Sequence, residues 1–201
     1  MKKFTLLSIT MLCASVLSAQ LSASIKKDES NKTNVKEEIG KEPYFMERYY
    51  EVKETYPSLK NIHGAFAAST ITKEKYMERY NGIKASYPDM KNGFDNYAAS
   101  DYSVDVFAKR YYEIRDTYAT TMGNYYGDYA GSTKTLPEFI KRFYEIKDSS
   151  PDMTDCFGQY AASDYTLAEF TKRYYGVKAS KIGIDNSSLA DYAGSKNKLA
   201  K

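Results

Sequence analysis

The feature that most restricts the fold of this chain is one helical segment that occurs five times. The copies read FMERYYEVKET (45–55), YMERYNGIKAS (76–86), FAKRYYEIRDT (107–117), FIKRFYEIKDS (139–149) and FTKRYYGVKAS (170–180). By subtraction of their positions, the arginines in these copies are 31, 31, 32 and 31 residues apart. A fixed period of this length is typical of a repeat architecture.

Each copy has the apolar spacing of an amphipathic helix. In the third copy Phe107, Tyr111, Ile114 and Tyr118 follow the pattern i, i+4, i+7, i+11, which places them on one face. Hydroxyl residues precede four of the copies at equivalent positions, where they are expected to cap the helix N-terminus: Thr72, Ser103, Thr135 and Thr166. A capping box is predicted where Glu169 follows Thr166 by three residues.

A second, shorter helix is predicted after each long one. It is clearest in DMKNGFDNYAAS (89–100) and DMTDCFGQYAAS (152–163), where a proline precedes the segment and ends the long helix. Glycine in these short helices is expected to weaken them, by up to about 1 kcal/mol each relative to alanine. A helix pair this short cannot bury both of its faces alone, so neighbouring pairs must pack on one another.

The predicted fold is therefore all-α, an α-solenoid of about five 31-residue helix-turn-helix repeats stacked as a linear slab with two ends. The repeats are placed at approximately 43–71, 72–102, 103–134, 135–165 and 166–201. The polar C-terminal sequence AGSKNKLAK (193–201) is expected to cap one end of the slab.

The N-terminus carries the pattern of a secretory signal peptide. Two lysines precede an apolar run from 4 to 17, and small residues follow, so we assign 1–23 to the signal. The charged, weakly apolar segment 24–42 is predicted to be a flexible leader, and 43–201 the helical-repeat domain. We expect export to a periplasm, the extracellular space or the cell surface. No apolar run is long enough to span a bilayer.

Composition argues against several functional classes. Removal of the two signal lysines lowers the formal charge from +3 to about +1, too little for a nucleic-acid-binding face. No motif for a metal, a phosphate or another cofactor is present, and we expect none of these and no catalytic residues. We interpret His63 and Cys156 as core fillers, because they occupy positions equivalent to apolar or small residues in other copies. The chain is therefore not expected to be an enzyme.

Two columns of residues are the candidate binding residues. The first column lies five residues after the leading aromatic residue of each copy: Tyr50, Asn81, Tyr112, Tyr144 and Tyr175. The second consists of the repeated arginines: Arg48, Arg79, Arg110, Arg142 and Arg173. The tyrosines either pack between neighbouring long helices or form an exposed aromatic ladder, and the arginines either flank that ladder or extend along the surface.

The leading functional hypothesis is a secreted or periplasmic scaffold that binds a protein partner without catalysis. Tyrosine supplies a large apolar area and a hydroxyl group, which suits a protein interface. The first alternative is a self-assembling structural or surface-coat protein whose repeats stack end to end. The second is a carbohydrate-binding module in which a glycan stacks on the tyrosine ladder.

Overall fold

The computed structural model describes residues 44–180 and 183–200, which belong to one compact unit, Pro43–Lys201. The predicted signal peptide and flexible leader, 1–23 and 24–42, lie outside the described residues. The described part of the chain is helical and contains no strand, so the all-α class is confirmed. None of its helices is long and apolar enough to cross a membrane.

Long and short helices alternate along the chain and form five pairs. The long helices are α2 (Phe45–Thr55), α4 (Lys73–Ser86), α6 (Val104–Tyr118), α8 (Leu136–Ser149) and α10 (Leu167–Ala179). The short helices are α3 (Lys60–Ala68), α5 (Phe94–Ala99), α7 (Tyr126–Gly131), α9 (Phe157–Ala162) and α11 (Asn186–Gly194). Two 3₁₀ turns, η1 (Lys91–Gly93) and η2 (Thr154–Cys156), lead into α5 and α9.

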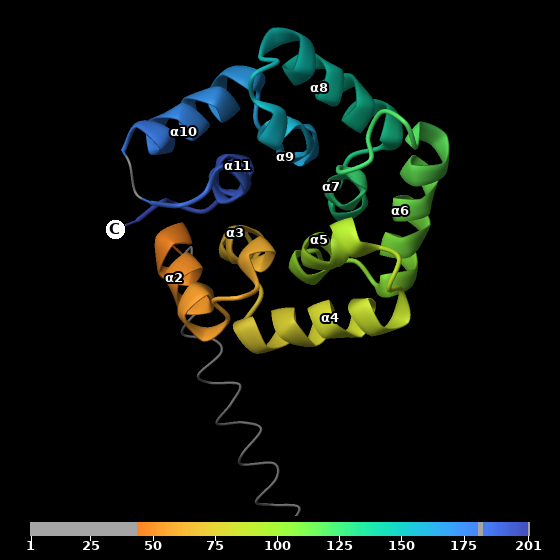
Figure 1. Ribbon diagram of the computed structural model, residues 1–201. Coiled ribbons are helices and arrows are strands. Elements are labelled where there is room, and N and C mark those ends of the chain that lie inside the picture. The colour runs from red at the N-terminus through yellow and green to blue at the C-terminus, as the bar shows by residue number, and fades with distance from the viewer. Residues whose placement is uncertain (1–43, 181–182, 201) are drawn as a thin grey trace, which may run out of the picture. The chain divides into compact units, whose positions relative to one another are not determined.

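The five pairs form a closed ring. The long helices make the outer sides of a pentagon, and the short helices stand inside it (Figure 1). Each short helix packs on the long helix of its own pair and on the short helices of both neighbouring pairs, including α11 on α3. The hydrophobic core fills the space between the two layers and is built largely from phenylalanine and tyrosine.

Ring closure corrects the expected linear slab with two free ends. Asn197 is buried, and its Nδ2 donates a hydrogen bond to the carbonyl oxygen of Ala67 at 2.7 Å. The ring of Phe45 packs edge-on against Tyr192 with centroids 5.4 Å apart, and its N–H donates to the carbonyl oxygen of Lys198 at 2.8 Å. The C-terminal segment therefore joins the last pair to the first instead of capping a free end.

The predicted helix starts are confirmed. The hydroxyl oxygens of Thr72, Ser103 and Thr166 accept hydrogen bonds from N–H groups in the first turns of α4, α6 and α10. The capping box at Thr166 is also present, with the Glu169 carboxylate accepting from the Thr166 N–H at 2.9 Å. Thr135, predicted as a simple cap, forms an equivalent capping box with Glu138 at the start of α8.

Glycines of the short helices lie where a neighbouring helix approaches closely. A Cβ atom at Gly158 would meet the carboxylate of Asp128, and one at Gly64 would meet the carboxylate of Asp191. A Cβ at Gly127 would meet the side chain of Asn96. These glycines, expected only to weaken their helices, thus make room for side chains from the adjacent pair, including the pair across the ring closure.

Candidate binding surfaces

The four tyrosines of the first column have their rings held in fixed orientations at the surface. Each packs edge-on against the aromatic residue that precedes it, with ring centroids 5.4 to 5.8 Å apart. A cation three residues later lies over each tyrosine ring: Lys53, Arg115, Lys147 and Lys178 over Tyr50, Tyr112, Tyr144 and Tyr175. Tyr50 and Tyr175 are 41% and 44% exposed, and Tyr112 and Tyr144 are half-buried. We call these four residues the tyrosine surface.

Two of these tyrosines also connect neighbouring pairs. The hydroxyl of Tyr112 donates to Asp89 at 3.1 Å, and that of Tyr175 donates to Asp152 at 3.4 Å. Both carboxylates lie in the turn of the preceding pair. Partial burial, with the nearby carboxylate as a further cause, raises the pKa of Tyr112 and of Tyr175. The column therefore combines the two alternatives, exposure and inter-repeat contact. Asn81 is exposed and contributes no ring.

The repeated arginines face the inside of the domain. In the fourth pair, Arg142 Nη2 donates to the carbonyl oxygens of Tyr160 and Tyr165, at 2.8 and 2.7 Å. Its guanidinium carbon lies 4.2 Å from the centroid of the Tyr160 ring. The other arginines make the same contacts: Arg48 over Phe66, Arg79 over Tyr97, Arg110 over Tyr129 and Arg173 over Tyr192, each bonded to carbonyls at the end of its short helix. These guanidinium groups cap the short helices, and the structure gives no support to their use as binding residues.

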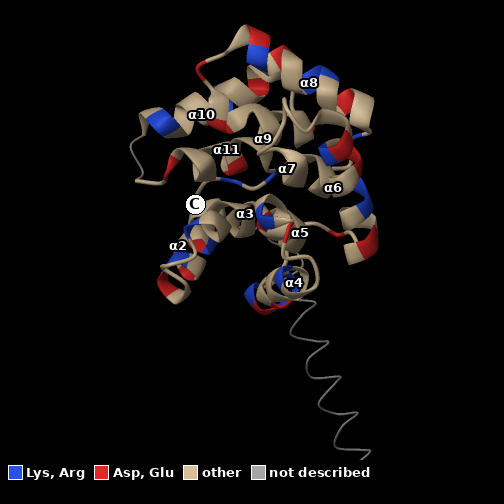
Figure 2. Cartoon of the chain, turned by 45° about the vertical axis from the view of Figure 1, so that its right-hand side comes forward, with Lys and Arg blue, Asp and Glu red and all other residues tan. Residues whose placement is uncertain are grey.

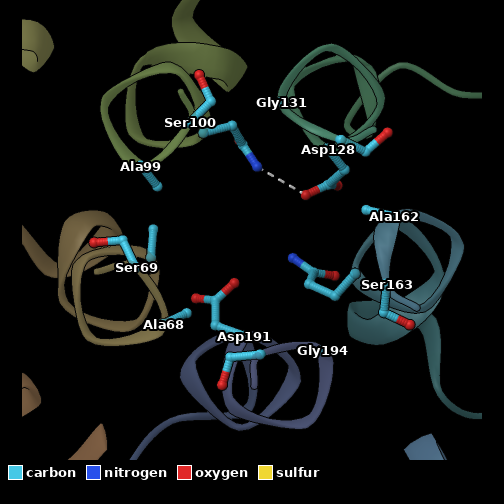
Figure 3. A pocket seen from close by; sticks show the side chains of 15 residues that line it. Ala68, Ser69, Ala99, Ser100, Asp128, Gly131, Ala162, Ser163, Asp191 and Gly194 are labelled. Carbon is cyan, nitrogen blue, oxygen red and sulfur yellow. Dashed lines mark hydrogen bonds between the residues drawn. The ribbon is translucent and has the colours of Figure 1, made fainter. Parts of the chain in front are cut away.

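A central cavity of about 230 Å³ lies among the short helices (Figure 3). Side chains at three equivalent positions of the five pairs line it. One level consists of Ser69, Ser100, Ser132, Ser163 and Ser195, the next of Ala68, Ala99, Gly131, Ala162 and Gly194, and the third of Ala65, Asn96, Asp128, Gln159 and Asp191. This cavity was not predicted from the sequence, although the third level places polar residues within otherwise apolar helices at the repeat interval.

The third level gives the cavity its electrostatic character. The carboxylates of Asp128 and Asp191 point toward its centre, and Asn96 Nδ2 donates to Asp128 Oδ1 at 2.9 Å (Figure 3). No lysine or arginine lines the cavity. Burial, together with the charge of Asp95, raises the pKa of Asp128 to about 7, and burial raises the pKa of Asp191 well above its ordinary value. The cavity therefore offers an anion no cationic side chain as a partner.

The serine hydroxyls of the first level donate hydrogen bonds to carbonyl oxygens of their own short helices. The Oγ atoms of Ser69 and Ser163 donate to the carbonyl oxygens of Phe66 and Tyr160, at 2.8 and 2.9 Å. These hydroxyls point away from the cavity centre (Figure 3). Across residues 44–180 and 183–200, no group of three or more His, Cys, Asp or Glu side chains is placed to hold a metal ion.

His63 and Cys156 occupy core positions, in agreement with their interpretation as fillers. His63 is buried, its ring packs edge-on against Tyr49, and its Nε2 lies 3.0 Å from the carbonyl oxygen of Tyr56. Cys156 is fully buried, and burial raises the pKa of its thiol to about 12. A thiol with that pKa is a poor nucleophile at neutral pH.

Comparisons with known protein families, with curated proteins and with solved structures found no match to this chain.

Proposed function

We propose that this chain is an exported, non-catalytic helical-repeat protein of the α-solenoid type that binds a protein partner through the tyrosine surface. The observation that carries this proposal is the fixed orientation of four surface tyrosines, each between a buried ring and a cation. Export is inferred from the signal-like N-terminus.

An aromatic ring that is already oriented in the free protein loses little conformational entropy when it binds a partner. Tyrosine buries a large area on binding, and little conformational entropy remains to be lost when its ring is already packed. Such residues dominate the binding energy of many protein interfaces. The two most exposed members, Tyr50 and Tyr175, belong to the first and fifth pairs, which are neighbours because α11 packs on α3. Ring closure therefore brings the ends of the tyrosine column to adjacent pairs.

The alternatives are supported less well. End-to-end stacking needs terminal repeats with unpaired apolar faces, whereas the first and last described pairs cover each other. Charged residues of both signs are mixed over the outer helices (Figure 2), which does not favour nucleic acid. A glycan could stack on the same rings, so carbohydrate binding remains the second candidate for this surface.

The test compares the wild type with the double variant Tyr50→Ala/Tyr175→Ala. Each protein is used as bait, with chemical cross-linking, in the extracellular or envelope fraction of the source cells, and each is applied to a glycan array. Val106→Ala is the control, since Val106 is 44% exposed on α6 but lies outside the column. Thermal melting verifies that all three proteins are folded.

We expect a protein that is captured by the wild type and by Val106→Ala, and at least tenfold less by the double variant. Equal capture by all three baits would contradict the proposed surface. Glycan binding that the double variant loses, without any captured protein, would assign the surface to carbohydrate instead. If light scattering shows that the purified wild type forms large assemblies, the self-assembling structural protein would become the favoured function.

A further inference from the structure

The outer surface of the fifth pair carries a groove that is separate from the central cavity. Its volume is about 450 Å³, and its lining includes Lys172, Arg173, Gly176, Tyr192 and Leu199. Most of the surface that these side chains present is apolar, contributed by residues such as Leu199. Tyr192 is 8% exposed, with the rest of its side chain packed in the domain.

Equivalent positions in other pairs show which group belongs beside this tyrosine. Gly176 corresponds to Glu113 in the third pair and Glu145 in the fourth. There the hydroxyls of Tyr129 and Tyr160, which correspond to Tyr192, donate to these carboxylates at 2.8 and 2.6 Å. In the fifth pair glycine supplies no carboxylate. Among the described residues, the side-chain hydrogen bonds at Tyr192 are accepted by its carbonyl oxygen, and none is made by its hydroxyl.

A cation is also available at this groove. Lys172 is exposed, and no carboxylate of the described residues lies within ion-pair distance of it. Glu169 also lines the groove, and its carboxylate is engaged in the capping box, where Oε2 accepts from the N–H and the hydroxyl of Thr166 at 2.9 and 2.7 Å. Lys172 therefore carries a positive charge that no side chain of the described chain neutralises directly.

The first and second pairs lack this combination. In the first pair Glu51 is present, but Phe66 replaces the tyrosine, and Glu51 pairs with Lys73 at 3.1 Å. In the second pair Gly82 and Tyr97 hold the equivalent positions, but Glu78 replaces the lysine that the fifth pair has at Lys172. Glycine, tyrosine and lysine thus coincide in the fifth pair alone.

We propose that this groove binds the carboxylate of an aliphatic acid, held where Glu113 and Glu145 place their own carboxylates. The Tyr192 hydroxyl donates a hydrogen bond to it, Lys172 neutralises its charge, and Leu199 lines the wall that receives its alkyl chain. The carboxylate belongs either to a free short-chain acid or to the C-terminus of a peptide, and the experiment separates these sources. This site is independent of the tyrosine surface and of the partner proposed for it.

The experiment is a titration of the ¹⁵N-labelled protein with butyrate, followed by amide chemical shifts. Butylamine serves as the probe of equal chain length without a carboxylate. We expect saturable shifts centred on Gly176 with butyrate and none with butylamine. A short acetylated peptide with a free C-terminal carboxylate, compared with the same peptide as its C-terminal amide, tests the second source. If the peptide with the free carboxylate binds more tightly than butyrate, the site is assigned to peptide C-termini.

Two variants make the test specific. Tyr192→Phe is expected to fold, since Phe66 holds the equivalent position in the first pair, and to weaken binding about tenfold or more by loss of a charge-assisted hydrogen bond. Gly176→Glu supplies the carboxylate within the chain and should abolish binding. Gly82→Glu, the same change at the equivalent position of the second pair, should leave binding at Gly176 unchanged.

Two results would overturn the proposal. One is the absence of saturable shifts near Gly176 with both butyrate and the free-acid peptide. The other is binding that Tyr192→Phe and Gly176→Glu leave at the wild-type level, which would show that the carboxylate does not replace the glutamate.

Discussion

A single arginine donates hydrogen bonds to the C-terminal end of each short helix. The helix α9 has 6 residues, far fewer than an isolated helix needs in water. The last carbonyl oxygens of a helix have no donor within it, and Arg142, on the long helix of the same pair, donates to those of Tyr160 and Ala161. Ser163 is a second donor to the Tyr160 carbonyl. The arginine column is therefore a set of caps that tie each short helix to its long partner.

The variant Arg142→Ala should lower the free energy of unfolding by about 2–4 kcal/mol, because it removes the guanidinium donor from the carbonyl oxygens of Ala161 and Tyr165 and the contact with the Tyr160 ring. Urea denaturation followed by circular dichroism measures the change. The adjacent exposed substitution Lys141→Ala should stay within about 0.5 kcal/mol of the wild type. Similar effects of the two variants would mean that the arginine extends along the surface and caps nothing.

Asp128 makes stability depend on pH. Burial raises its pKa in the folded state from the ordinary value of 3.8 to about 7, so between these values the folded chain binds more protons than the unfolded chain. Its favourable contribution is present at pH below the ordinary value and is lost as the pH rises through about 7. Burial also raises the pKa of Asp95, whose charge acts on Asp128, and that of Asp191, which lines the same cavity.

The substitution Asp128→Asn should therefore stabilise the protein near pH 8, by roughly 1–3 kcal/mol, stabilise it less near pH 5, and change little only below the ordinary pKa of 3.8. Asn96 Nδ2 can still donate to the new amide oxygen, so the contact across the cavity is kept. Thermal melting across this pH range measures the effect, with the exposed Asp148→Asn as the control. A gain that is equal at both pH values would contradict a raised pKa of Asp128.

At the scale of the elements, the effect of a glycine on stability depends on whether it lies in a long outer helix or in a short inner helix. In a long outer helix glycine is a weak helix former with open space around it, as at Gly82. In a short inner helix it leaves room for a side chain from the next pair, as Gly158 does for Asp128. Helix propensity and packing therefore favour opposite substitutions in the two layers.

The same change should have opposite signs in these layers. Gly82→Ala should raise the free energy of unfolding by about 0.5–1 kcal/mol, because alanine is the better helix former. Gly158→Ala should lower it by about 1–3 kcal/mol, since the new methyl group meets the Asp128 carboxylate and the Tyr125 ring. Chemical denaturation measures both, and a stabilising Gly158→Ala would contradict the close approach of α7 and α9.

The sequence predicted these elements well wherever local chemistry decides them. Hydroxyl caps and apolar spacing gave the starts of α4, α6, α8 and α10, because these signals act within one or two turns. The caps made by arginine were not predicted, since their acceptors lie 18 or more residues away. The central cavity was missed for the same reason: its lining comes from five different short helices.

At the scale of the domain, ring closure replaces the free ends of a linear repeat stack. In an open stack the terminal repeats each expose one apolar face, which capping repeats must cover. Here the first and last pairs cover each other through Phe45, Tyr192 and Asn197. The repeat period gave the building unit, but the rotation between successive units depends on side-chain packing, so the sequence pattern did not distinguish a ring from a slab.

The distance between the first and last pairs tests this closed ring most directly. Spin labels at Glu47→Cys and Lys172→Cys mark the first and fifth pairs, and labels at Glu47→Cys and Glu78→Cys mark two adjacent pairs. These three positions are equivalent in the repeat and exposed. The fully buried Cys156 should not take up label, and the chain is expressed without residues 1–23 to remove Cys13.

Double electron–electron resonance on the two doubly labelled proteins gives both distances. The ring predicts that the first and fifth pairs are as far apart as the first and second, within the spread of the labels. A first-to-fifth distance roughly four times the adjacent one would show a linear stack and contradict the closed ring.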